Sequence, residues 1–343
     1  MAKPASQIKP LKLAVVGSDT LAGREIQEVL KARGVEASIA PYAANAEGNF
    51  GEEEGEAVYL EALDAKTLAD YQAVILTGTP EGAAKAYELA KSAGGKPLLI
   101  DCMGDLDSQP EARITAPLFE DAAIHSAWLL VVAHPAASAL ALVLRRLAAS
   151  KRMRAAAAHI FEPASERGKR GISELQQQIV GLLSFKAVPK EIFDAQLGFN
   201  LLSQYGEQAP MKLAGVEQRI ERHVATLVNR NTAGGAIPMP SVRVVQAPVF
   251  HGYSLSVWVE FEDKVNAGEL GEAMASTQIE IRGEQDEAPD NVGAAGQSGL
   301  IVGDIRIDRN NARAAWLWVV ADNLRLRADG AADLVSALGA RTQ

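Results

Sequence analysis

Residues 11–23 read Leu-Lys-Leu-Ala-Val-Val-Gly-Ser-Asp-Thr-Leu-Ala-Gly, and this stretch decides the fold class of the chain. The apolar run over 11–16 predicts a buried strand. The glycine turn that follows it leads into an amphipathic helix over 22–33, which ends at Gly34. A second short strand is expected over 35–40. A strand, a helix and a strand in this order predict a parallel βαβ unit with a right-handed crossover.

The same alternation continues as far as residue 133 and predicts a doubly wound, Rossmann-like α/β domain that binds a nucleotide. Strands are expected where short apolar runs are bounded by turn residues, and a helix where apolar residues recur at helical spacing. A stretch rich in glycine and glutamate is expected to be a solvated loop. The expected strands are 73–76, 97–100 and 128–133, the helix is 81–93 and the loop is 48–56.

Beyond about residue 150 the pattern changes to that of an α+β domain. A helix is expected over 173–183, and alternating apolar and polar residues over 253–262 predict a strand of an antiparallel sheet with one covered face. We therefore expect a first domain made of residues 1–133 together with about 322–343, and a second domain over 134–321. The other expected elements are a strand over 241–247, a loop over 283–299, a strand over 316–320 and a helix over 330–338.

The composition excludes several classes of protein. The chain has 343 residues, of which 34 are basic and 43 acidic, so its formal net charge is −9. Such a surface disfavours nucleic acid as a partner, because phosphate backbones bind to basic faces. No apolar run is long enough to span a bilayer and the N-terminus does not resemble a signal peptide, so we expect a cytoplasmic protein with no membrane partner. The one cysteine, Cys102, excludes an intramolecular disulfide and a cysteine-rich metal site.

The turn between Gly17 and Gly23 is the first candidate site. It joins a strand to a helix, where backbone N–H groups and the helix N-terminus can hold a phosphate. Asp19 or Thr20 stands where a glycine would allow a diphosphate to approach closely, and the Asp19 carboxylate would repel it. No acidic residue closes the second strand to hold a ribose, and no arginine follows to hold a 2′-phosphate. The turn therefore predicts either a nucleotide site or a plain tight turn that the fold retains.

The remaining polar candidates have an ordinary structural interpretation beside a functional one. The five histidines form no pair with the spacing of metal ligands, so no metal site is expected. His251 and Tyr253 lie two residues apart on an expected strand and would share a face, either as an acid/base pair or as ordinary polar residues. Cys102 follows a strand and is expected to be a small buried side chain. The basic runs 151–154 and 167–170 are expected to be solvated, although the second could bind an anion.

Five segments in a fixed order carry a resemblance to a known family. Residues 317–325 read LWVVADNLR, and residues 248–254 read PVFHGYS, close to a PVFxGHS pattern. Weaker matches are GISEL at 171–175, the Phe-Asn pair at 199–200 and the glycine turn that begins with Val15. Together these segments span nearly the whole chain, and they resemble the aspartate-semialdehyde dehydrogenase family. The C-terminal segment is the only one that is specific by itself.

The resemblance implies a Rossmann-like NADP-binding domain followed by an α+β dimerisation domain, so a homodimer is expected. The family joins a phosphate to aspartate semialdehyde, or reverses that reaction, with NADP. A cysteine thiolate attacks the carbonyl group and a histidine acts as acid/base. By the same resemblance the cofactor-binding positions of this chain are Gly17, Ser18, Asp19, Thr20, Leu21, Gly23, Gly78 and Asn323.

At the catalytic positions the chain departs from the family. The family's NPxC motif falls on residues 133–137, where Ala137 replaces the cysteine and His134 replaces the asparagine. Tyr253 replaces the acid/base histidine, and Glu162 stands near the position of a glutamine. The other changed positions are the loop 101–106, which lacks the family's phosphate-handling arginine, and Leu326, which replaces a lysine.

Because alanine has no nucleophilic atom, the sequence predicts a family member without dehydrogenase activity, similar to the Usg-type proteins, with a regulatory or interaction role. One alternative is an NAD(P)-dependent oxidoreductase that acts on an aldehyde or oxo group by direct hydride transfer, with Tyr253 or His251 as acid/base. Another is a nucleotide-binding sensor without turnover. The apolar row of the strand 255–261 could lie in the core or in a dimer interface.

Overall fold

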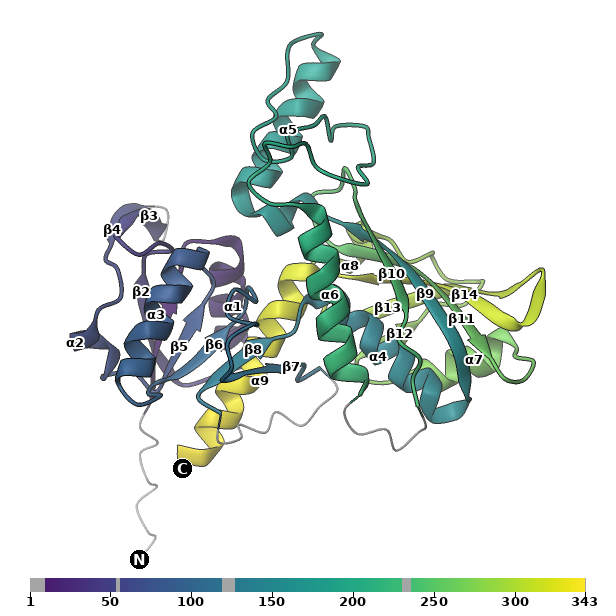
Figure 1. Cartoon of the computed structure of the whole chain (residues 1–343), viewed down its shortest axis with the longest axis horizontal. Helices are drawn as coiled ribbons and strands as arrows, with labels where there is room; N and C mark the ends of the chain where they lie inside the picture. The colour runs from purple at the N-terminus through teal and green to yellow at the C-terminus, as the bar shows by residue number, and fades with distance from the viewer. Residues whose placement is uncertain (1–9, 54–55, 119–126, 230–235, 343) are drawn as a thin grey trace, which may run out of the picture. The chain divides into compact units, whose positions relative to one another are not determined.

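The computed structural model describes residues 10–53, 56–118, 127–229 and 236–342. The chain forms two compact units, one of residues Met1–Val132 with Arg327–Gln343 and the other of residues Ala133–Leu326 (Figure 1). Each unit contains its own six-stranded sheet. In the described part of the chain, no helix combines the length and the apolar character that a membrane span requires.

The first unit is a Rossmann-like α/β domain, as the sequence predicts. Its strands lie in the order β2-β1-β5-β6-β8-β7, and every neighbouring pair is parallel. The chain passes from β1 outward to β2 and then returns to the other side of β1, so the β1/β5 boundary is the switch point of the sheet. The strands are β1 (Leu11–Val16), β2 (Ala37–Tyr42), β5 (Ala73–Leu76), β6 (Leu98–Asp101), β7 (Ala112–Thr115) and β8 (Leu129–Val132).

Helices cover both faces of this sheet because its strands are apolar on both sides. Leu13, Val15 and other side chains of one face pack against α1 (Leu21–Ala32) and α9 (Asn323–Thr342). Ala14, Val16 and their neighbours on the opposite face pack against α3 (Pro80–Ser92), with the single turn of α2 (Ala65–Leu68) beside it.

The expected loop over 48–56 is wrong, because this region begins a hairpin. The hairpin consists of β3 (Asn49–Glu53) and β4 (Glu56–Leu60), which pair in antiparallel register. Phe50 lies opposite Tyr59, and their rings meet edge to face with centroids 5.2 Å apart. This cross-strand aromatic pair favours the hairpin, whereas the glycine and glutamate content had suggested a loop.

The second unit contains a mixed sheet in the order β10-β9-β11-β14-β13-β12. The prediction of an antiparallel sheet is right for its centre and wrong at its two ends. Strand β9 pairs antiparallel with β11, and so do β11 with β14 and β14 with β13, but the outer pairs are parallel. The strands are β9 (Met153–Glu162), β10 (Ser241–Gln246), β11 (Tyr253–Phe261), β12 (Ile279–Ile281), β13 (Leu300–Asp308) and β14 (Asn311–Ala321).

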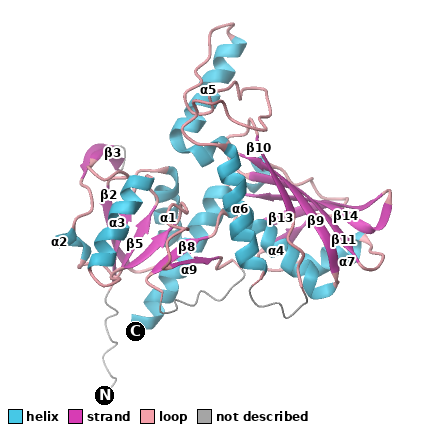
Figure 2. Ribbon diagram, in the orientation of Figure 1, coloured by secondary structure: helices cyan, strands magenta, loops and turns pink. Residues whose placement is uncertain are grey.

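Helices α4 (Pro135–Ser150), α6 (Leu213–Val228) and α7 (Ala267–Met274) pack against one side of this second sheet (Figure 2). The apolar row Leu255, Val257, Val259 and Phe261 is at most 1% exposed and lies in the core of this unit. The alternative that this row forms a dimer interface is therefore wrong. The remaining helices of the unit are the 3₁₀ turn η1 (Ala164–Arg167), α5 (Gly168–Leu183) and α8 (Asn291–Ala294).

Several element boundaries differ from the expected ones because polar residues are buried. Helix α9 begins at Asn323 rather than near residue 330, and its Arg327 and Asp329 are 4% and 5% exposed. Arg33 of α1 pairs with Asp329 at 2.6 Å, so this face of α9 is buried although its sequence is charged. Strand β13 escaped prediction because Gly303 and charged residues interrupt its apolar pattern.

The turn between β1 and α1 depends on the absence of a side chain at Gly23. A Cβ atom there would lie 2.2 Å from the carbonyl oxygen of Gly17. Gly23→Ala should therefore force the backbone apart and lower the free energy of unfolding by about 1–3 kcal/mol. The measurement is urea unfolding followed by circular dichroism.

Gly215 in α6 provides the matched control, because a Cβ there would have no heavy atom within 4 Å. Gly215→Ala should be neutral or stabilise the protein by up to about 1 kcal/mol. Equal unfolding midpoints for the two variants would contradict the close approach at Gly23.

Candidate functional site

The site begins where β9 ends, β11 starts and α4 starts. Glu162 is the last residue of β9, Tyr253 is the first of β11, and the antiparallel register places the two side by side. His134 directly precedes α4. The hydroxyl oxygen of Tyr253 lies 3.4 Å from Nε2 of His134 and 3.4 Å from Oε2 of Glu162. Three segments far apart in the sequence thus bring a phenol, an imidazole and a carboxylate together.

Arg167 supplies the positive charge of this cluster. Its guanidinium forms an ion pair with Glu162, whose side chain is fully buried. Glu166, one residue earlier, places its Oε2 atom 3.9 Å from Nε2 of His134. The expectation that residues 167–170 are solvated is therefore wrong for Arg167, whose side chain is only 9% exposed. The 3₁₀ turn η1 directs this side chain inward toward the end of β9.

Polar side chains from other segments complete the network. Tyr205 donates a hydrogen bond of 2.6 Å to Oε1 of Gln246, and its hydroxyl lies 3.4 Å from Glu162. Asn323 donates to Oε1 of Glu166 at 2.7 Å and accepts from the backbone N–H of Gly252 at 3.0 Å. The side chain of Asn323 thus positions the turn before β11.

A second histidine supports the start of α4. The backbone N–H of His134 donates to Nδ1 of His223 at 2.9 Å. His223 belongs to α6 and is fully buried. Because its Nδ1 atom accepts a hydrogen bond, this nitrogen carries no proton. This hydrogen bond links the N-terminus of α4 to α6 and so fixes the backbone position of His134.

Burial controls the ionisation of the cluster. Burial raises the pKa of Glu162, and the nearby guanidinium of Arg167 opposes that rise without cancelling it. Burial lowers the pKa of Arg167, but Glu162, Tyr205 and Glu166 outweigh this effect and the pKa ends above its ordinary value. Burial also raises the pKa of Tyr205, and the Glu162 carboxylate adds to the rise. Two carboxylates thus face one permanent cation, which favours a proton retained inside the cluster.

Ala137 lies in the first turn of α4, three residues beyond His134, and is fully buried. A methyl group there offers no atom that could attack a carbonyl carbon. Of the three positions at which the resemblance places catalytic residues, Glu162 and Tyr253 are in contact. Ala137 contributes only packing.

Cys102 lies in the first unit, in the apolar core beneath β6, and is 2% exposed. Its packing as a small buried side chain agrees with the prediction from sequence. Burial raises the pKa of its thiol, and the neighbouring Asp101 carboxylate raises it further. Since only the thiolate is a good nucleophile, burial and the raised pKa both disfavour Cys102 as a nucleophile. Asp101 itself shapes the loop by accepting from the N–H groups of Met103, Gly104 and Leu106.

The expected pairing of His251 with Tyr253 on one strand face is wrong. Strand β11 begins only at Tyr253, and His251 lies in the preceding bend. Gly252 between them has a φ of +83°, which turns the backbone and ends the two-residue periodicity. The carbonyl group of His251 accepts a hydrogen bond of 3.2 Å from Asn291. His251 is therefore not part of the buried cluster.

The glycine turn of the first unit lies at the switch point of the sheet, where a Rossmann domain binds its nucleotide. Gly17 has a φ of +86° and packs so closely on Gly78 that a Cβ atom would lie 2.7 Å from the Gly78 Cα. The hydroxyl of Thr20 accepts from the N–H of Gly23 at 3.0 Å and donates to the carbonyl oxygen of Gly17 at 2.8 Å. Gln27 donates to the carbonyl oxygen of Ser18 at 3.0 Å.

These contacts leave few donors for a diphosphate. The N–H groups of Gly17, Ser18, Thr20 and Gly23 all donate to oxygen atoms of the protein. The carboxylate of Asp19 lies in the same turn, and its buried Oδ1 atom has no hydrogen-bond partner among the described residues. Leu21, the first residue of α1, adds an apolar side chain. The turn keeps the backbone of a dinucleotide site, but its donor set does not fit an anionic NADP diphosphate.

Comparisons with known proteins agree with this architecture. A family model for the semialdehyde dehydrogenase dimerisation domain matches residues 148–326. USG-1 protein homologues from Azotobacter vinelandii and Pseudomonas aeruginosa are 26% and 28% identical, and each match covers 92% of this chain and 93% and 94% of theirs.

The solved structure of a probable aspartate-semialdehyde dehydrogenase from Pseudomonas aeruginosa superimposes with a TM-score of 0.81 at 27% identity. The match covers 96% of this chain and 98% of that one. The resemblance seen in the sequence is thus confirmed.

The sequence did not reveal the partners of Glu162. Glu166 and Arg167 are neighbours in η1, whereas Tyr205 and Gln246 come from two other segments. The four residues form no motif, and no periodicity links them. The resemblance singled out His134, Glu162 and Tyr253, and Tyr253 was also singled out by its spacing from His251. Arg167 was noted only as part of a basic run. The fold, rather than any local pattern, assembles the network.

Arg167→Met should lower the free energy of unfolding by about 3–5 kcal/mol, because it leaves the buried Glu162 carboxylate without its cation. The double variant Glu162→Gln with Arg167→Met should be less destabilised than Arg167→Met alone, because residue 162 then carries no charge that needs the guanidinium. Urea unfolding followed by tryptophan fluorescence measures both.

Arg170→Met is the matched control. Arg170 pairs with Glu191 at 3.9 Å, and both side chains are more than 70% exposed. The loss of such a surface pair should cost less than about 1 kcal/mol. Similar losses for Arg167→Met and Arg170→Met would contradict the structural role of the buried pair.

Proposed function

Because the chain belongs to the semialdehyde dehydrogenase family, we propose that it is a member in which a buried polar network has replaced the catalytic machinery. Its role is then regulation or interaction rather than turnover. The observation that carries the proposal is the fully buried Ala137 at the position of the family's nucleophile. The polar groups beside it hold one another in place.

The missing thiol is the strongest support. Removing a covalent nucleophile costs on the order of 10⁴ to 10⁶ in rate. Cys102 is the only thiol in the sequence, and it lies in the apolar core of the first unit with a raised pKa. Neither position offers a thiolate that could form a thioester.

The condition of the glycine turn supports the same proposal. Asp19 adds a negative charge where a diphosphate would bind, and most of the turn's N–H groups already have acceptors within the protein. We propose that the first unit serves as a structural scaffold and binds NADP weakly or not at all. We also keep the cytoplasm as the proposed location, which suits a free buried thiol.

One observation favours a second candidate function. Tyr253 lies within 3.4 Å of both an imidazole and a carboxylate, which is the geometry of an acid/base group whose proton can be relayed. An oxidoreductase that transfers hydride directly would need no thiol and could use this hydroxyl. It would still need a nicotinamide cofactor, and the glycine turn argues against one.

A turnover assay separates the two functions. The chain should give no NADP reduction with aspartate semialdehyde and phosphate above the rate of the Tyr253→Phe variant. That variant keeps the ring and removes the hydroxyl. Turnover that the substitution abolishes would contradict the proposal and favour direct hydride transfer.

In calorimetry, NADP should give no binding heat up to millimolar concentration, whereas saturable binding would favour a sensor.

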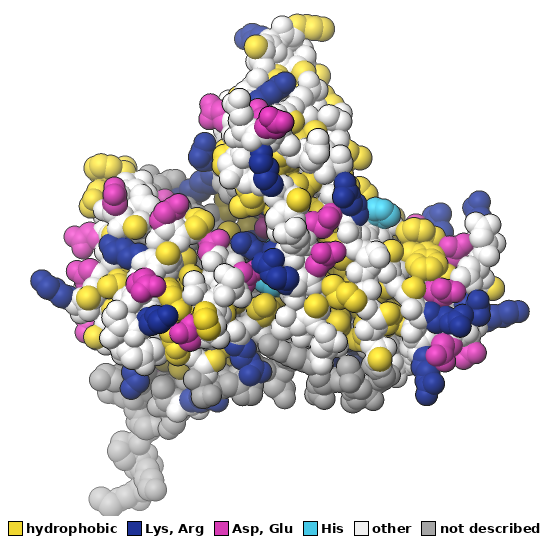
Figure 3. Space-filling view, viewed as in Figure 1, with side chains coloured by type: hydrophobic (Ala, Val, Ile, Leu, Met, Phe, Trp, Pro, Cys, Tyr) yellow, Lys and Arg dark blue, Asp and Glu magenta, His cyan; other side chains and the backbone are white. Residues whose placement is uncertain are grey.

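We further propose that the chain forms a homodimer through the open face of the second sheet. Phe161, Trp258 and Trp316 lie on the side opposite α4, α6 and α7, and Trp316 is 39% exposed. Apolar side chains also gather at the tip of α5, where Leu183 and Phe185 are 69% and 98% exposed (Figure 3). Exposed aromatic surface of this kind is typical of an interface.

Trp316→Glu should convert the dimer into a monomer, because it places a charge at the centre of the open face. Light scattering at micromolar concentration measures the change. Phe50→Glu is the matched control, because Phe50 is 78% exposed on the first unit. It should leave the mass unchanged. A monomeric unmodified chain, or a dimer that survives Trp316→Glu, would contradict this interface.

A further inference from the structure

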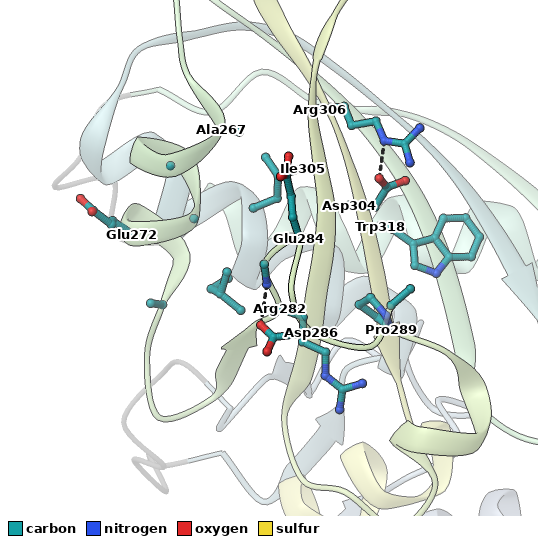
Figure 4. Close-up of a pocket in the computed structure, with 16 residues that line it drawn as sticks. Ala267, Glu272, Arg282, Glu284, Asp286, Pro289, Asp304, Ile305, Arg306 and Trp318 are labelled. Atoms are coloured by element: carbon teal, nitrogen blue, oxygen red, sulfur yellow. Dashed lines mark hydrogen bonds and ion pairs between the residues drawn. The ribbon is translucent and has the colours of Figure 1, made fainter.

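A groove with a volume of about 1020 Å³ lies along one edge of the second sheet (Figure 4). Helix α7 contributes the small residues Gly268 and Gly271, strand β13 contributes Asp304–Arg306, and residues 282–289 form the rim. This volume lies at the upper end of the range for pockets that hold drug-sized molecules, about 300–1,000 Å³. It suits a peptide segment better than a small metabolite.

The floor of the groove includes a strand edge without a neighbour. Strand β12 pairs with β13 only over Leu300–Val302, after which the N–H of Arg282 donates to the Val302 carbonyl oxygen and the chain turns away. Within the described residues, no strand pairs with the 304–308 part of β13 on that side. An open edge beside a groove is the geometry in which an extended peptide adds as a further strand.

The charge of the rim indicates the kind of peptide. Residues 280–290 read EIRGEQDEAPD, which contains five carboxylates and one arginine. That arginine, Arg282, is already paired with Glu280 at 2.8 Å. Glu272 and Glu284 line the groove, and neither makes an ion pair with another described residue. A segment with lysine or arginine side chains would complement this rim.

A second copy of this chain does not suit the edge. Symmetric pairing of two such edges would bring one acidic rim against another, and like charges oppose that contact. Strand β13 also carries a bulge between Gly303 and Arg306, with Asp304 at a φ of +47° and paired with Arg306. A bulge makes this stretch of the edge irregular, so a rigid second sheet would not pair along it, whereas a short flexible peptide can follow it.

We propose that this groove binds an extended, cationic peptide segment of another protein, which adds to the open edge of β13 and places its basic side chains against the acidic rim. The site is separate from the buried cluster around Glu162 and does not depend on whether the chain catalyses a reaction. It gives a chain without turnover a specific surface for a partner.

The probe is a fluorescein-labelled ten-residue peptide of alternating lysine and valine, and fluorescence anisotropy measures its binding to the full chain. Gly268→Trp should fill the groove and weaken binding by roughly tenfold or more. Gly268→Ala is the control. A Cβ at Gly268 would meet only the Asn266 side chain, at 3.5 Å, so the alanine should bind like the unmodified chain. Glu272→Lys with Glu284→Lys should weaken binding without filling the groove.

Hydrogen exchange supplies the second readout. The bound peptide should slow exchange of the backbone N–H groups of residues 304–308. Absence of binding at millimolar peptide would overturn the proposal, as would equal affinity for Gly268→Trp and the unmodified chain. Unchanged exchange at 304–308, or equal binding of an alternating glutamate–valine peptide, would show adhesion to general surface charge and would also overturn it.

Discussion

The buried ion pair between Glu162 and Arg167 is the constraint on which the second unit depends. Removing two charges from water costs several kcal/mol for each ion, and their attraction offsets that cost only when the remaining polar atoms are also satisfied. The hydroxyls of Tyr205 and Tyr253 lie 3.4 Å from the Glu162 carboxylate, and Gln246 donates to the Glu162 carbonyl oxygen. Among the described residues, the buried Nε of Arg167 has no hydrogen-bond partner. The end of β9, the end of β10 and the start of β11 are therefore held in one arrangement.

The same constraint explains why the proposed loss of chemistry is a change of the whole site and not a single substitution. A catalytic centre needs a group free to exchange protons and space for a substrate. Here Tyr253 is fully buried, and its hydroxyl faces Glu162 and His134. In the proposed assignment Ala137 stands at the position of the nucleophile, and the polar groups near it bind one another. A polar network of this kind stabilises the fold, and the proposed role then depends on other surfaces of the molecule.

Much of the architecture could be predicted from the sequence, because it rests on local patterns. The apolar run 11–16 and its glycine turn identified the Rossmann-like unit, and the alternation over 253–262 identified a central strand of the second sheet. The prediction from sequence failed where polar residues are buried, as in α9. It also failed where a cross-strand aromatic pair favours a hairpin, as in β3 and β4. The cluster around Glu162 could be predicted only in part, because long-range contacts leave no periodicity in a single sequence. Arg167 is the clearest example, because a run of basic residues normally predicts side chains exposed to solvent, whereas its side chain is buried.

The most direct test of the central claim concerns the single thiol. The resemblance implies a reaction that requires a cysteine thiolate, and the sequence offers only Cys102, which is buried with a raised pKa. The native chain should therefore gain no mass after an hour in iodoacetamide at pH 8, whereas the chain unfolded in guanidinium should gain one carbamidomethyl group. Rapid modification of Cys102 in the native chain would show an accessible, reactive thiolate and would contradict the account.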